Sequence, residues 1–166
     1  QYSPSTPNET TVAGVNLQYS LIETTGNGDI EITGTGPTAS AGEGGDNDGV
    51  NIENGSIIQN GSGTGGTGSI TITGTSYANG EGIDMDDEAG SKVIAGSGGL
   101  TMTGTNDDGQ SSGLQLRGII NAIGGTITLS GTGGTGTTGD ADSAEGIETF
   151  GDVAIGSTNT TSVTMI

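Results

Sequence analysis

The chain has no cysteine, no histidine and no tryptophan, and only one phenylalanine and three tyrosines among its 166 residues. Without cysteine it forms no disulfide framework. Without histidine and cysteine it lacks the usual general bases and thiol nucleophiles of active sites. So few aromatic side chains leave little material for a bulky globular core. We therefore expect a thin aliphatic core and no enzymatic activity.

Positive charge is almost absent too. The chain carries 2 basic residues against 20 acidic ones, which gives a net charge of −18. Nucleic acid needs a positive footprint, so it is excluded as a partner, and an anionic membrane surface is disfavoured for the same reason. No apolar run approaches the length of a membrane span, so we expect no membrane insertion. A large negative charge instead attracts cations.

What the chain does contain is a repeated phrase in which Ile, Leu, Val or Met alternates with a polar residue, mostly Thr. It occurs five times, at residues 29–35, 69–75, 99–105, 126–132 and 162–166. Such alternation predicts a β-strand with one buried face.

A second phrase, Gly followed by an apolar, a polar and usually another apolar residue, alternates with the first. Its copies are residues 14–17, 49–52, 82–85, 113–116 and 146–149. The steps between their first apolar residues are 35, 33, 31 and 33. A shorter apolar group follows each copy, at residues 21–22, 57–58, 93–94, 119–120 and 153–155. The chain thus divides into five units of three strands, residues 14–48, 49–81, 82–112, 113–145 and 146–166.

Repetition at this period predicts an all-β parallel β-helix, or β-solenoid, with three short strands per rung and about five rungs. Each unit buries its apolar face only against its neighbours, and glycine forms the corners. At a strand spacing of about 4.8 Å, five rungs make a rod roughly 24 Å long. A sandwich of β-hairpins explains the alternation but not the constant order of three strands. Disorder, which glycine-rich composition also favours, does not explain the regular apolar triplets.

The two ends differ from the repeats between them. Residues 1–13 lie outside the repeat and contain Pro4 and Pro7, which favour an extended arm. At the other end, Val163, Met165 and Ile166 are core-type residues with no polar cap after them. Two interpretations stay open: a fragment of a longer array, or an end that stacks head to tail on another copy, with residues 1–13 as an intersubunit strand.

Acidic loops precede three copies of the second phrase, at residues 45–49, 106–109 and 139–143. Their carboxylates are hard oxygen ligands of the kind that Ca²⁺ prefers. The alternative is that Asp, Asn and Gly are simply the residues that turns require, so the fold needs no cofactor. A further acidic group, Asp84, Asp86, Asp87 and Glu88, is interpreted as a solvated face. The candidate Ca²⁺ ligands are Asp46, Asp48, Asp107, Asp108, Asp140 and Asp142.

Two surface features also suggest sites. The outward threonines form three columns: Thr71, Thr101, Thr128 and Thr164; Thr33, Thr73, Thr103 and Ser130; and Thr35, Thr75, Thr105 and Thr132. A Thr-x-Thr array of this kind suits ice binding, although Thr also has high β-propensity and Glu31 and Ser130 interrupt the array.

Sequons for N-glycosylation occur at Asn8, Asn54, Asn60 and Asn159, and we expect Asn54 and Asn60 on corners.

The phrase at residues 68–75, followed by a Gly-rich loop and a Gly-Ile-x-Met step, resembles the repeats of filamentous-haemagglutinin-like exoproteins exported by two-partner secretion. The resemblance covers most of residues 14–166 and implies a β-helix with an extracellular or cell-surface role in adhesion or matrix.

We therefore expect a structural subunit of an extracellular filament that polymerises head to tail. The alternatives are a segment of a secreted adhesin that contacts surface glycans, or an ice-binding module.

Overall fold

The computed structural model describes residues 13–38, 47–64, 66–77, 79–86, 90–107, 111–135, 145–157 and 159–166. Within these ranges the chain forms β-strands and one short 3₁₀ turn, η1 (Gly61–Gly63), and no α-helix. The prediction of an all-β protein is confirmed. Apolar and polar residues alternate in most strands, and Gly, Asn and Ser fill the turns, which explains why helices do not form.

The strands follow the repeats. The first three repeats contain three strands each: β1 (Val15–Gln18), β2 (Leu21–Thr24) and β3 (Ile30–Thr35); β4 (Val50–Glu53), β5 (Ile57–Asn60) and β6 (Ile70–Ser76); β7 (Ile83–Met85), β8 (Lys92–Ala95) and β9 (Leu100–Asn106). The last two contain two each: β10 (Leu114–Ala122) and β11 (Thr126–Thr132); β12 (Ile147–Ile155) and β13 (Ser162–Met165).

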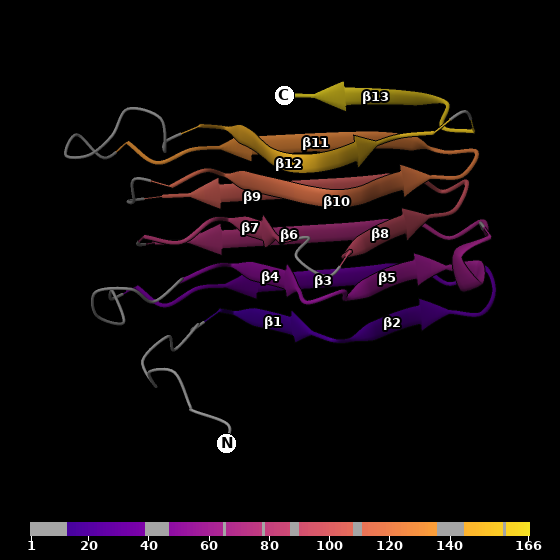
Figure 1. Ribbon diagram of the computed structural model, residues 1–166, viewed down its shortest axis with the longest axis horizontal. Coiled ribbons are helices and arrows are strands. Elements are labelled where there is room, and N and C mark those ends of the chain that lie inside the picture. The colour runs from indigo at the N-terminus through magenta and orange to yellow at the C-terminus, as the bar shows by residue number, and fades with distance from the viewer. Residues whose placement is uncertain are drawn as a thin grey trace, which may run out of the picture.

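Every pairing among the described strands is parallel, and it joins equivalent strands of successive repeats. One sheet has five strands in the order β13-β11-β9-β6-β3, and the other has eight, ordered β1-β4-β7-β10-β8-β5-β2 with β12 beside β10. Figure 1 shows the repeats stacked from β1 to β13. A sandwich of hairpins would require antiparallel pairs, so that alternative is wrong.

The last two repeats depart from the expected three separate strands. In β10 and β12 the first two strands of the repeat run together, so the chain forms two sheets rather than three separate ones. The corner is still present, because Gly118 and Gly151 have φ of 81° and 57° and the register shifts between Leu116 and Gly118. A glycine in the left-handed region bends the strand without ending its pairing.

The core lies between the sheets and is built from the inward residues of successive repeats. In the five-stranded sheet one column pairs Ile30, Ile70, Leu100, Ile127 and Val163 in register. The middle three residues of that column are fully buried or nearly so. Because each repeat contributes about the same side-chain volume, the same packing recurs from one repeat to the next.

Glycine in the Thr-Gly-Thr phrase has a structural reason. At this edge the two sheets converge until their backbones touch, so a Cβ on Gly74 would lie 1.9 Å from the carbonyl oxygen of Gly82. A Cβ on Gly104 would lie equally close, 1.9 Å, to the carbonyl oxygen of Gly113. Both distances are far below contact, and the obstacle is backbone, so no side chain fits there.

We predict that Gly104→Ala destabilises the fold by about 2–3 kcal/mol, because the methyl group forces apart two backbones. The matched control is Gly26→Ala, since a Cβ at Gly26 meets nothing within 4 Å and its φ is not positive. Urea unfolding followed by circular dichroism measures both variants. Equal midpoints for Gly104→Ala and Gly26→Ala would contradict the close approach of the sheets.

Two carboxylates, Asp29 and Glu23, link neighbouring repeats. The Asp29 carboxylate accepts hydrogen bonds from the Ser69 N–H at 2.7 Å and from the Ser69 hydroxyl at 2.8 Å. These bonds, the backbone one first, hold the pKa of Asp29 below its ordinary value of 3.8. Hydrogen bonds from Ser62 and Gln59 likewise lower the pKa of Glu23 below 4.5.

A lowered pKa means that Asp29 stabilises the fold above its unfolded pKa and loses that effect as the pH falls through its folded pKa. We therefore predict that Asp29→Ala lowers the melting temperature at pH 7, and that the deficit disappears below the folded pKa. Glu31→Ala is the control, since it removes the same charge from an exposed position two residues away. A deficit that stays constant as the pH falls would contradict the assignment.

Candidate functional site

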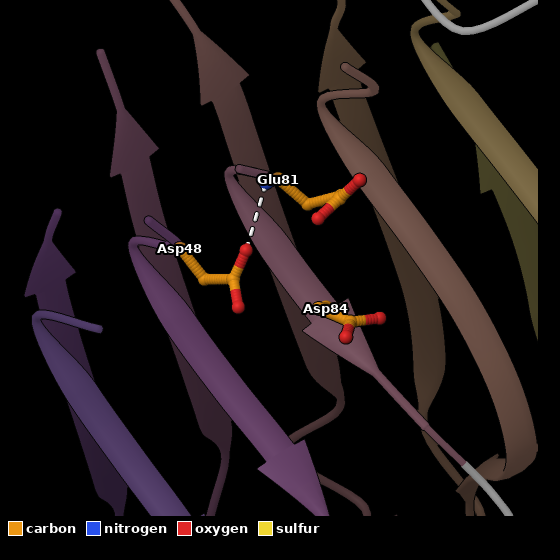
Figure 2. Close-up of side chains that lie close together, drawn as sticks. All are labelled: Asp48, Glu81 and Asp84. Atoms are coloured by element: carbon orange, nitrogen blue, oxygen red, sulfur yellow. Dashed lines mark hydrogen bonds between the residues drawn. The ribbon is translucent and has the colours of Figure 1, made fainter. Parts of the chain in front are cut away.

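Among the described residues the structure gathers one acidic site, and only part of it was expected. Of the candidate Ca²⁺ ligands, Asp48 is described and fully buried, and Asp107 is described and exposed. The other four, Asp46, Asp108, Asp140 and Asp142, lie outside the described residues. Asp48 meets Glu81 and Asp84, and one carboxylate oxygen of each lies within 4.8 Å of the others (Figure 2).

Strand pairing explains this arrangement. Strands β4 and β7 are parallel neighbours, with Val50 beside Ile83. Asp48 and Glu81 each stand two residues before those partners, so they lie side by side at the start of the strands. Asp84 follows Ile83 in β7. Figure 2 shows the three carboxylates around the start of β7.

Two neighbouring groups complete the site. The Glu81 N–H donates a hydrogen bond of 2.9 Å to Oδ1 of Asp48, which fixes that carboxylate. Asn51, on β4, pairs in register with Asp84 and is only 4% exposed. Its Nδ2 donates to Oε1 of Glu53 at 3.4 Å, while its Oδ1 is buried without a hydrogen-bond partner among the described residues. A buried acceptor without a donor is costly.

The acidic site therefore offers three carboxylates in a partly buried setting. These are hard oxygen ligands, which suit Ca²⁺ better than a soft transition metal. The sequence had placed Asp84 on a solvated face and had not included Glu81. The sequence does contain a signal that Glu81 lies beside Asp48, because the two residues occupy the same position in successive repeats.

The nearby Asp86 has a different role from the one expected. Nη1 of Arg117 lies 3.0 Å from Oδ1 of Asp86, and the same guanidinium lies 5.0 Å from the centroid of the Phe150 ring. Arg117 thus balances local acidity and joins three successive repeats. Both side chains of the ion pair are partly exposed, so its contribution to stability is small. Asp87 and Glu88 lie outside the described residues.

The N-glycosylation sequons that the structure describes differ in how exposed their asparagines are. Asn8 lies outside the described residues, Asn54 is a half-buried corner residue with φ of 56°, and Asn159 is exposed. Asn60 is fully buried, contrary to the expectation of an exposed corner. Its Nδ2 donates to Oγ1 of Thr24 at 3.0 Å and to the Gly28 carbonyl at 2.9 Å, and its Oδ1 accepts from the Gly96 N–H at 3.3 Å. That amide links three repeats and is not accessible to a glycan in the folded chain.

The threonine columns lie in the order expected from the sequence. Strand register places Thr33, Thr73, Thr103 and Ser130 in line across the five-stranded sheet. The register also aligns the two outer columns, one of which contains Thr71 and the other Thr75. All these side chains are exposed or half-buried, on the face away from the core. We call this surface the threonine face.

No protein-family model, no curated protein and no solved structure matches the chain. In the described part of the chain, no helix has the length and apolarity needed to cross a membrane. The resemblance to filamentous-haemagglutinin-like exoproteins thus stays a prediction, and function has to be inferred from the surfaces described above.

We predict that Ca²⁺ raises the melting temperature, because an ion that binds only the folded state stabilises it, by about 2.7 kcal/mol at 100 times its dissociation constant. Asp84→Asn should lose most of this gain. With a chelator present it should be at least as stable as the parent, since it relieves repulsion between carboxylates. Asp152→Asn, the same change at an exposed position on β12, is the control. Equal Ca²⁺ responses in the two variants would contradict a cation at the acidic site.

Proposed function

We propose that the chain is a structural subunit of an extracellular or cell-surface filament, in which a β-solenoid continues from one copy to the next. Under this proposal the two parallel sheets are faces of one solenoid, and each repeat is a rung with three sides. The in-register pairing of equivalent strands supports it, because the same core columns run through successive repeats.

The observation that carries the proposal is the in-register stacking of equivalent strands, which continues unchanged to the last described rung, formed by β12 and β13. Val163, Met165 and Ile166 are 41%, 53% and 73% exposed. The preceding rung buries their counterparts, since Val163 pairs with Ile127 and Met165 with Leu129, both fully buried. Among the described strands, β13 pairs only with β11, so one backbone edge of β13 is open. An open edge above exposed apolar side chains recruits another strand.

The first rung offers the complementary surface. Its inward residues Val15, Leu17 and Ile22 are only partly buried against the core, and among the described strands β3 pairs only with β6. Continuing the register would bring Val163 of one copy beside Ile30 of the next, and Met165 beside Ile32. Such a contact joins unlike surfaces and does not close on itself, so it builds a filament.

Charge favours end contacts over side contacts. The chain carries a net charge of −18, which makes the flanks of neighbouring copies repel one another. The ends contribute apolar side chains and unpaired backbone groups, whose association gains both hydrophobic burial and hydrogen bonds. This difference favours a linear filament over lateral aggregates.

We expect electron microscopy of the purified chain to reveal uniform fibres with an axial repeat of about 24 Å, set by five rungs at the usual strand spacing. Combining Val163→Lys with Met165→Lys should abolish the fibres, because it places two charges in the joint. The two side chains are partly exposed, so the monomer should keep its circular dichroism spectrum. Thr164→Lys is the control, since it adds charge to the same strand on the opposite face.

Two outcomes would contradict the filament. A parent chain that stays monomeric at every concentration would instead favour the adhesin alternative, in which further rungs of a longer protein cover this surface. Fibres that persist in the double variant would show that a different contact holds the copies together.

A further inference from the structure

The threonine face is a regular surface. Its residues project outward from β3, β6, β9, β11 and β13, and the register of this sheet has no shift from one strand to the next. The other sheet does have a register shift, at β10 and β12. The outward positions of the five-stranded sheet therefore form a lattice in two dimensions.

The dimensions of this lattice follow from strand geometry. Neighbours in a column are separated by about 4.8 Å, the strand spacing, and neighbours along a strand by about 6.6 Å, two residues of rise. Each threonine presents one hydroxyl and one methyl group, and branching at Cβ restricts the side chain to few rotamers. The lattice is therefore rigid before any ligand arrives, which reduces the entropy lost on binding.

The hydroxyl groups of this face are available to solvent. Within the described part of the chain, the central residues Thr73, Thr103 and Ser130 have no hydrogen bond from their side chains. Elsewhere the threonines serve the fold: Thr24 Oγ1 donates to the Gly28 carbonyl, and Thr160 Oγ1 donates to the Ala122 carbonyl. The threonine face therefore holds its hydroxyls in fixed positions, ready to order water.

Charge narrows the choice of ligand. The protein has 20 acidic residues, yet the three columns contain only one of them, Glu31, at the edge of the sheet. A neutral surface does not attract ions, polyelectrolytes or charged lipid headgroups. It suits a neutral ligand that repeats in two dimensions, that bonds to hydroxyl groups, and that tolerates methyl groups between them.

We propose that the threonine face binds ice. The spacings between oxygen atoms on crystal planes of ice are close to the two repeats of the lattice, so water held between the columns can merge with the crystal. This binding is independent of the filament, because end-to-end stacking leaves the sides of the solenoid exposed. A filament would extend the same lattice from copy to copy and so strengthen adsorption through multivalency.

The test uses the Val163→Lys, Met165→Lys double variant as the parent, so that the filament and the ice-binding face are examined separately. We expect it to show thermal hysteresis and to inhibit ice recrystallisation. Thr103→Tyr places a bulky side chain at the centre of the face, in a strand where Tyr is favourable, and should lose most of both effects. Gln115→Tyr, an outward position near the start of β10, should lose neither. Circular dichroism checks that every variant is folded.

A second variant tests the face by gain rather than loss. Glu31→Thr removes its one acidic residue and extends a threonine column to β3, so hysteresis should increase. Three results would overturn the inference: a parent without effect on ice, a Thr103→Tyr variant as active as the parent, or no gain from Glu31→Thr. Co-sedimentation with a crystalline polysaccharide, lost in Thr103→Tyr without any effect on ice, would assign the face to that surface instead.

Discussion

In-register parallel pairing between equivalent strands is the constraint on which the rest of the structure depends. Each strand is hydrogen-bonded to the same strand of the next repeat, so a residue lies beside its own counterparts. One register therefore aligns the core columns, the glycine contacts and the threonine face together. A slip of one residue would move every inward side chain to the outer face, which is why the alternating pattern fixes the register so strongly.

The same alignment brings together residues of one chemical type, in addition to aligning the core. Acidic residues that occupy one position in successive repeats are brought together, which is how Asp48 meets Glu81. Glycines aligned in the same way allow the backbones of the two sheets to touch at one edge. Columns of threonine leave one side neutral in a protein that is otherwise strongly acidic. The proposed filament and the proposed ice-binding face both use this repetition, the first along the stack and the second across its side.

Much of the fold could be predicted from the sequence, because a fold of repeated parallel strands is governed by local pattern. The strands of the five-stranded sheet, the inward residues and the three threonine columns all follow from alternation with a period of two. The candidate site was less accessible. Asp48 could be predicted as a ligand, but its partners Glu81 and Asp84 could not be assigned from the acidic loops alone, because the pairing of β4 with β7 brings them together.

The sequence by itself determined the repeat, the all-β class and the face of each strand, because these depend on the spacing of neighbouring residues. Only the tertiary structure decided how the repeats meet. It joined the first two strands at the corners of Gly118 and Gly151, where glycine bends the chain without ending its pairing. It also buried Asn60, whose amide bonds to groups of the repeats on both sides. Such contacts join residues more than thirty positions apart, and no local pattern records that distance.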